Sequence, residues 1–86
     1  MEILEKIIKS VMDGEVEECE KVVKEALQQG IDPMEIIKKG LSKAMTTIGE
    51  KFQKLEIFLP DVIVAADAVV AGIEILKPKL KTKNAW

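Results

Sequence analysis

The side chains that most often carry catalysis or bind metals are almost absent from this chain. Among its 86 residues there is no histidine and a single cysteine, Cys19. This excludes histidine-based acid–base catalysis, Ser-His and Cys-His nucleophilic pairs, and metal sites that need histidine or several cysteines. Cys19 falls on the apolar side of a predicted helix, where a small core residue is the ordinary interpretation. We therefore predict no catalytic and no metal-binding residues in this chain by itself.

Acidic residues gather between positions 15 and 20, where carboxylates could bind a cation. These residues are Glu15, Glu17, Glu18 and Glu20. Di-metal sites in helical bundles use Glu-x-x-His pairs, which a chain without histidine cannot form. The acidic run is therefore predicted to be a solvated helix face, with Lys21 and Lys24 beside it.

A second group of residues suits contact with an apolar ligand or partner. The stretch from Phe52 to Val62 contains both phenylalanines of the chain, together with Leu55, Ile57 and Leu59. Connecting segments normally run over the wet surface and are polar. An apolar connection of this kind predicts an apolar cluster at one end of the domain. The cluster either plugs the chain's own core or faces something outside the chain.

The predicted start of the last helix is also unusual. Pro60 at the first helical position would make Leu59 the N-cap, and leucine has no side-chain oxygen to accept an amide hydrogen bond. Phe58 can be explained by packing on Ile63 as a hydrophobic staple. That explanation leaves Leu59 without a structural reason.

Four amphipathic helices are predicted to position these residues. Apolar side chains recur at helical spacing, and no segment alternates with the two-residue period of a strand. The predicted helices cover residues 3–12, 16–27, 33–52 and 60–76. Short connections between them imply antiparallel neighbours. The predicted fold class is all-α, an antiparallel four-helix bundle.

Local signals support the predicted helix ends. Gly30 is expected to stop the second helix in a left-handed conformation. Asp32 followed by Pro33 is a strong start for the third helix. The fourth helix is expected to end near Leu76, because Pro78 disfavours helical geometry at the residue before it.

Composition and charge fit one small folded domain. Hydrophobic residues make up 48% of the chain and charged residues 33%, and the net charge is −2, so no nucleic-acid partner is expected. Residues 1–77 are predicted to form the bundle and residues 78–86 a basic linker or tail. No signal peptide and no apolar span of about 20 residues is visible. We expect a cytoplasmic protein without a membrane partner.

The fourth helix is more apolar than one buried face requires. Only Asp61, Asp67 and Glu74 are charged between positions 61 and 76. The stripe predicted to face the core consists of Val62, Ala66, Val69, Ile73 and Leu76. The stripe predicted to form a contact surface consists of Val64, Ala68, Ala71 and Ile75. Either this helix is central in the bundle, or its second stripe packs on a partner, such as a second copy in a homodimer.

The stretch from Ile48 to Val62, IGEKFQKLEIFLPDV, carries a specific resemblance. Its pattern of Gly-Glu-x-Phe, six residues and then Leu-Pro resembles the helical N-terminal module of cobalamin-binding corrinoid proteins. Such modules occur in methanol and methylamine methyltransferase systems and in cobalamin-dependent methionine synthase. The resemblance covers nearly the whole chain up to Pro78. It implies a four-helix cap module that packs on a Rossmann-like cobalamin domain, over the upper, methyl-bearing face of the corrin.

The resemblance also implies roles for individual residues. Phe52, Leu59 and Val62 match the family's cap residues and would cover the upper face of the corrin. The family usually has glycine at the position of Leu55, so the turn after the third helix is expected to differ. The domain that supplies the lower histidine ligand is absent, so methylcobalamin would be a shared cofactor that this chain alone does not bind tightly.

The implied partners are a Rossmann-like cobalamin domain, in cis or in trans, and a methyltransferase subunit. The chain would then be a non-catalytic part of a methyltransferase system. Two alternatives stay open. One is a helical self-association module without a cofactor, and the other is the cap of a cobalamin-sensing regulator.

Overall fold

Two helices open the chain and supply one half of the core. In the computed structural model, which describes residues 2–80, they are α1 (Glu2–Met12) and α2 (Val16–Gln28). Each turns one apolar side inward, as its sequence pattern predicts. Ile7 of α1 and Val23 of α2 are both fully buried at the contact between the helices and the rest of the bundle.

The third predicted helix is continuous but contains one wide turn. It consists of α3 (Pro33–Ile36), the π-helical turn η1 (Ile37–Leu41) and α4 (Ser42–Gln53). Its predicted start is confirmed, because the Asp32 carboxylate accepts a hydrogen bond from the backbone N–H of Met34 at 3.0 Å. That bond satisfies one of the free N–H groups in the first helical turn.

The π-helical turn keeps the apolar residues of this helix on one side. The backbone N–H of Ser42 donates to the carbonyl of Ile37, five residues earlier. In a regular α-helix, residues five apart point about 140° away from each other. Ile36 and Leu41 are nevertheless both fully buried. The wide turn therefore returns Leu41 to the side of Ile36, and Ile48 follows on the same side, also buried.

The last helix is longer than predicted at its C-terminal end. Helix α5 (Leu59–Leu80) continues through Pro78, so the predicted end near Leu76 is wrong. Proline removes one backbone donor, and close to the end of a helix the loss amounts to a single hydrogen bond. Residues 81–86, the remainder of the predicted basic tail, lie outside the described residues.

Three helices end in the same hydrogen-bonded turn. The residues just beyond α1, α2 and α4 are Gly14, Gly30 and Leu55, with φ of 68°, 87° and 61°. At the end of α2, for example, the N–H of Ile31 donates to the carbonyl of Ala26 at 3.1 Å. This is the Schellman pattern, in which a left-handed residue closes the helix. The predicted stop at Gly30 is confirmed.

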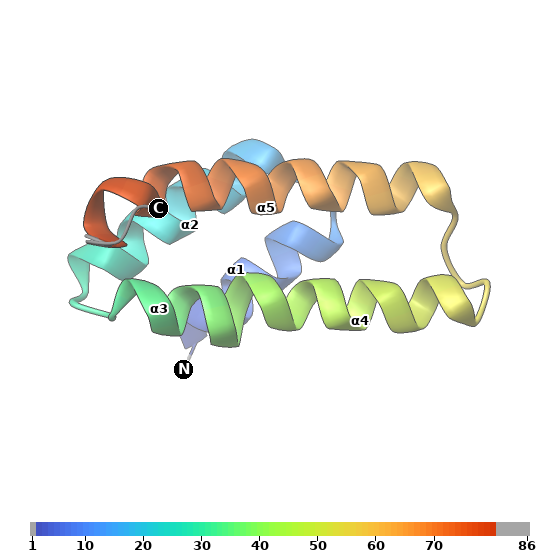
Figure 1. The fold of residues 1–86 in the computed structure, drawn as a ribbon, viewed down its shortest axis with the longest axis horizontal. Helices are drawn as coiled ribbons and strands as arrows, with labels where there is room; N and C mark the ends of the chain where they lie inside the picture. The colour runs from blue at the N-terminus through green and yellow to red at the C-terminus, as the bar shows by residue number, and fades with distance from the viewer. Residues whose placement is uncertain (1, 81–86) are drawn as a thin grey trace, which may run out of the picture.

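The helices pack as an antiparallel bundle, which confirms the predicted fold class (Figure 1). Helices α4 and α5 lie across the front of the view, with α1 and α2 behind them. The α4–α5 connection forms one end of the bundle. The α2–α3 connection and the C-terminal part of α5 form the other end. Helix α5 contacts every other helical segment, so much of its apolar surface is used inside the chain.

The side of α5 that faces the core differs from the prediction. Its buried residues are Ala65, Ala68, Gly72 and Leu76. Of the predicted core stripe only Leu76 is fully buried; the others are half-buried. Ala68, which was predicted to lie on the outward contact stripe, is fully buried instead.

Small residues on the inner side of α5 explain this difference. A side-chain carbon on Gly72 would lie 3.2 Å from Leu41 Cδ1 and 3.4 Å from Val23 Cγ2. The backbone of α5 therefore approaches its neighbours more closely than larger side chains would allow. Hydrophobic size alone would place the valines and isoleucines inside, which is why the predicted rotation of this helix was wrong.

Candidate functional site: the exposed apolar end of the bundle

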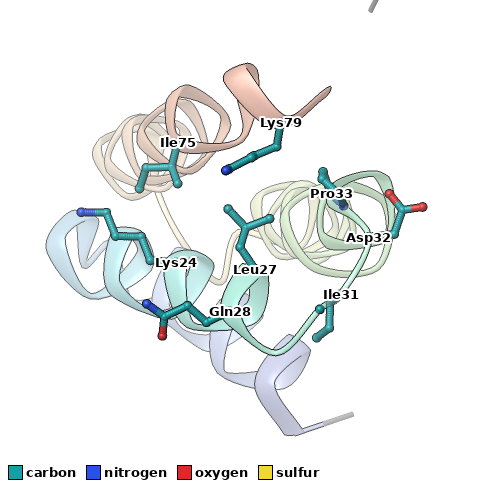
Figure 2. A pocket seen from close by; sticks show the side chains of 9 residues that line it. Lys24, Leu27, Gln28, Ile31, Asp32, Pro33, Ile75 and Lys79 are labelled. Carbon is teal, nitrogen blue, oxygen red and sulfur yellow. The ribbon is translucent and has the colours of Figure 1, made fainter. Parts of the chain in front are cut away.

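A groove of about 640 Å³ opens between the end of α2, the α2–α3 connection and the C-terminal part of α5. Leu27 and Lys79 point into it, whereas the amino group of Lys24 and the carboxylate of Asp32 turn away (Figure 2). Its lining thus offers an apolar floor with a single ammonium group and no set of groups able to perform acid–base chemistry. The groove lies at the end of the bundle opposite the α4–α5 connection (Figure 1).

Five large apolar side chains in and next to the α4–α5 connection are exposed. We call them the apolar end: Phe52 (43% exposed), Leu55 (75%), Phe58 (65%), Leu59 (57%) and Ile63 (53%). Among their neighbours in sequence, Ile57 and Val62 pack inward against the core. The interpretation that the whole cluster plugs the chain's own core is therefore wrong. Several large exposed apolar side chains at one end of a domain favour contact with a ligand or another protein surface.

Helix α5 begins one residue earlier than predicted. The carbonyl of Phe58 accepts hydrogen bonds from the backbone N–H groups of Asp61 (2.9 Å) and Val62 (3.3 Å), so Phe58 is the N-cap. The Asp61 carboxylate in turn accepts from the N–H of Phe58 at 3.0 Å. This reciprocal bond is half of a capping box, and a carboxylate is also favourable near a helix N-terminus. The prediction that Leu59 is the N-cap is wrong, and Leu59 lies in the first helical turn.

The same shift changes the hydrophobic staple. With Phe58 as the N-cap, the two staple positions fall on Ile57 and Val62. Both of these side chains are half-buried and pack against the core. Phe58 and Ile63, the predicted staple, are exposed. The inner pair anchors the start of α5, which leaves the outer side chains free to make other contacts.

The turn after α4 holds Leu55 in a strained conformation. Its N–H donates to the carbonyl of Phe52 at 3.1 Å, and the N–H of Glu56 donates to the carbonyl of Lys51 at 2.9 Å. An ion pair of 3.6 Å joins Lys51 Nζ to Glu56 Oε1 across the same turn. The left-handed conformation costs a non-glycine residue roughly 1–2 kcal/mol. Because the side chain of Leu55 is largely exposed, little packing within the chain offsets this cost.

The predicted cover residues all lie at this end. Phe52 lies in the last turn of α4, while Leu59 and Val62 lie in the first turn of α5. The side chains of Phe52 and Leu59 are exposed, whereas that of Val62 is half-buried. None of these side chains carries a donor or acceptor group, so together they can exclude water but cannot exchange protons or bind a metal ion.

The predicted contact stripe does not form one surface. Val64 lies against the turn at Gly14, where a side-chain carbon would come within 2.5 Å of Val64 Cγ1. Ala68 is buried in the core, Ala71 is half-buried, and Ile75 lines the groove at the other end.

A different set of residues forms the outward apolar side of α5, and sequence reasoning missed it. We call this set the outer face of α5; it consists of Leu59, Ile63, Ala66, Val70 and Ile73. Its members recur at intervals of four and three residues, so they share one side of the helix. The spacing was visible in the sequence, but the rotation of the helix was not.

Cys19 is a core residue, as predicted. It is fully buried, and burial raises the pKa of its thiol, although a hydrogen bond with Ser10 acts in the opposite direction. A thiol in such surroundings stays protonated and inert at neutral pH. Within residues 2–80, no three acidic or cysteine side chains gather closely enough to share a metal ion. None of the helices in that range has the length and hydrophobicity needed to cross a bilayer.

Gly49 is the one glycine that has neither a positive φ nor a close neighbour among residues 2–80. It is exposed in the interior of α4, and a side-chain carbon there would have no neighbour within 4 Å. By contrast, Gly14 and Gly30 have positive φ, and Gly40 and Gly72 are packed tightly against other helices. An unneeded glycine inside a helix costs about 0.5–1 kcal/mol relative to alanine.

Comparisons with known proteins agree on one family. The family described as the B12 binding domain matches residues 3–77. The monomethylamine corrinoid protein 1 of Methanosarcina mazei is 43% identical over 83 residues, which are 95% of this chain and 38% of that protein. The trimethylamine corrinoid protein of Methanosarcina barkeri is 40% identical over 84 residues, covering 98% of this chain and 39% of its own length.

A solved structure agrees with these relatives. The monomethylamine corrinoid protein of Methanosarcina barkeri superposes with a TM-score of 0.89 and 37% identity, over 92% of this chain and 37% of that chain. The chain thus spans a little over one third of the length of the relatives it matches. Sequence, fold and extent of the match agree, and the chain belongs to the B12-binding domain family as its helical cap module.

Proposed function

We propose that this chain covers the upper, methyl-bearing face of cobalamin that is held by a separate Rossmann-like domain, as the cap of a corrinoid methyl-carrier protein in a methyltransferase system. The observation that carries the proposal is the exposure of Phe52 and Leu59 at one end of an otherwise well-packed bundle. The names of the relatives, which are corrinoid proteins for methylamines, favour a methyl carrier over the cap of a cobalamin-sensing regulator.

The residues of the apolar end fit such a cofactor as a cover and not as a ligand. Phe52 and Leu59 offer apolar surface, and Val62 adds a branched side chain that the core holds in place. When bound by its own domain, cobalamin supplies the organometallic chemistry of methyl transfer. The side chains of this chain would exclude water from that chemistry without competing as ligands or proton donors.

The backbone at the apolar end supports a fixed cover. The Asp61 carboxylate caps the start of α5. This cap fixes Leu59 in the first helical turn, where its side chain is exposed. The turn at Leu55 is closed by two backbone hydrogen bonds and the ion pair between Lys51 and Glu56. Two defined turns thus hold Phe52 and Leu59 without any contact from outside, as a preformed cover requires.

The contact between the cap and the cobalamin domain must also be able to open. A methyl group can be transferred only when the cap moves aside, so its contact with the cobalamin domain has to be weak and reversible. We therefore expect the isolated chain to bind free cobalamin weakly or not at all. The domain that binds cobalamin, in cis or in trans, and a methyltransferase subunit would be the partners, in keeping with the chain's span of 38% of its relative.

The proposal is tested by grafting this chain into a relative. The matched 83 residues of the monomethylamine corrinoid protein 1 are replaced by this chain, and the chimera is loaded with methylcobalamin. We expect slower photolysis than for methylcobalamin free in solution. Phe52→Ala combined with Leu59→Ala should abolish this protection. Met34→Ala combined with Val70→Ala, which removes similarly exposed apolar side chains away from the apolar end, should preserve it.

Equal photolysis rates for the parent chimera and the Phe52→Ala, Leu59→Ala variant would contradict the proposal. Tight binding of free cobalamin by the isolated chain would contradict the reversible contact.

A second candidate function, self-association, is favoured by the outer face of α5. Ile63 and Val70 of this face are both more than half exposed. Two copies could bury these residues against each other as a homodimer. This candidate needs no cofactor and is separated from the first by the mass of the isolated chain in solution.

A further inference from the structure

Besides the groove at the end of α2, a groove of about 360 Å³ opens between α1, the wide turn η1 and the start of α4. We call it the lysine groove. Three residues of α1 and three lysines of the neighbouring helix line it: Leu4, Glu5, Ile8, Lys38, Lys39 and Lys43. Leu4 is buried and Ile8 half-buried, whereas all three lysines are exposed. The groove thus combines an apolar floor with a row of ammonium groups.

The wide turn η1 brings these lysines together. Lys38 and Lys43 are five residues apart, and in a regular α-helix their side chains would point about 140° away from each other. Because the π-helical turn lies between them, both line the same groove. The turn also packs closely on α1, since a side-chain carbon on Gly40 would lie 3.1 Å from Ile7 Cγ2. Such turns are frequent at functional sites.

The positive charge of the lysine groove is not balanced by its own surroundings. Lys39 Nζ forms an ion pair of 3.0 Å with Glu35 Oε1. Among residues 2–80, Lys38 and Lys43 form no ion pair. Within the described part of the chain, Glu5 is the one acidic residue that lines the groove. Charge complementarity therefore favours an occupant that carries carboxylates.

We propose that the lysine groove is a docking site for an acidic segment of the methyltransferase subunit, in which carboxylates flank an apolar side chain. The inference rests on the proposed function, which supplies that partner. The apolar side chain packs on the floor, and the carboxylates pair with the lysines. A nucleic acid is a poor occupant, because three lysines in a chain of net charge −2 do not form an extended positive surface. A small free anion would leave the apolar floor uncovered.

The position of the lysine groove leaves the apolar end free. Lys43 and Phe52 both belong to α4. Their separation in sequence places them about 13 Å apart along the helix axis and on opposite sides of it. A methyltransferase subunit bound at the groove can therefore hold the cap both before and after the apolar end leaves the cobalamin domain. Such a contact suits a cap that must move aside for methyl transfer.

The test measures the affinity of the methyltransferase subunit for the chimera described above. Lys38→Glu combined with Lys43→Glu should weaken binding by about tenfold or more, and less so at high salt. Glu5→Lys adds an ammonium group to the groove and should strengthen binding severalfold. The matched control is Lys6→Glu combined with Lys24→Glu. These two lysines are exposed and lie outside the groove, so the same change in net charge should leave the affinity nearly unchanged.

The occupant is identified by cross-linking with a carbodiimide, which joins amines to carboxylates. We expect mass spectrometry of the complex to find Lys38 or Lys43 joined to an acidic residue of the methyltransferase subunit. Cross-links from these lysines to the cobalamin domain, or to a second copy of the chain, in place of the subunit would overturn the proposal.

Photolysis of methylcobalamin separates this proposal from the proposed function. The chimera with Lys38→Glu and Lys43→Glu should protect methylcobalamin as well as the parent chimera does. A loss of protection would mean that the groove contacts the cobalamin domain, and it would overturn the docking site. Equal affinity of this variant and the parent for the methyltransferase subunit, or no binding by the parent, would also overturn it. In both of these cases the proposed cover at Phe52 and Leu59 still stands or falls by its own photolysis test.

Discussion

The backbone N–H of Leu55 donates a hydrogen bond to the carbonyl of Phe52 at 3.1 Å, in a turn that Leu55 completes in a left-handed conformation with φ of 61°. The same turn is made by Gly14 and Gly30 at the ends of two other helices. Among the described residues, Leu55 is the one non-glycine residue with a left-handed backbone. It lies in the same turn as Phe52, which is proposed to cover a cofactor. Strain of this kind often accompanies a functional site.

Leu55→Gly is expected to stabilise the isolated chain by about 1 kcal/mol, because glycine adopts this conformation without steric cost. The largely exposed leucine side chain gives up little packing in exchange. Urea denaturation followed by circular dichroism measures the difference.

Gly30→Ala is the matched control for that experiment, since it introduces a side chain at the equivalent position of α2. It should destabilise the chain by a comparable amount. Equal or lower stability of Leu55→Gly would show that the Leu55 side chain packs in solution, contrary to the structure.

Asp61→Ala should destabilise the bundle by about 0.5–2 kcal/mol, because it removes the acceptor for the N–H of Phe58 and a favourable charge at the start of α5. Asp67→Ala, at an exposed position in the middle of the same helix, is the control and should change stability far less. Thermal unfolding of both variants decides the matter, and similar losses would refute the capping role of Asp61.

Ala68→Glu and Val70→Glu separate packing from association. Ala68 is fully buried, so a glutamate there should unfold the chain. Val70 is 57% exposed, so its replacement should leave the fold intact. If the chain forms a homodimer through the outer face of α5, sedimentation equilibrium should give a dimer for the parent and a monomer for Val70→Glu. A monomer for both removes that candidate.

Cys19 should make stability fall at alkaline pH. Burial raises the pKa of this thiol in the folded chain, so the unfolded chain loses its proton first, near pH 8.5. The stabilising contribution is therefore complete below that pH and declines as the pH rises through the folded pKa. The free energy of unfolding measured from pH 7 to pH 10.5 should fall less steeply for Cys19→Ala than for the parent. Parallel curves would argue against the buried thiol as the cause.

The helices themselves were predictable because the signals for them are local. The apolar spacing of α1 and α2, the cap at Asp32 and the stop at Gly30 act within a few residues, and each is found where the sequence predicts it. The resemblance to corrinoid proteins depended on the equally local pattern from Gly49 to Pro60.

The rotation of α5 could not be predicted because it depends on a contact distant in sequence. Gly72 packs on Leu41 and Val23, which belong to other helices. A prediction from hydrophobicity alone places the large side chains of α5 in the core. Where two helix backbones approach closely, however, the small side chains of α5 lie at the contact. The N-cap at Phe58 was missed for a related reason: the proline suggested a boundary, but the Asp61 carboxylate determined it.

The wide turn η1 also sets the direction in which the apolar end is aimed. If the same residues ran in regular α-helical form instead, everything after this turn would be rotated by about 100°. Phe52 would then swing to another side of the bundle, and Ile48 would leave the interior. The wide turn η1, about three turns away from the α4–α5 connection, thus keeps Phe52 at the apolar end while Leu41 and Ile48 stay in the core.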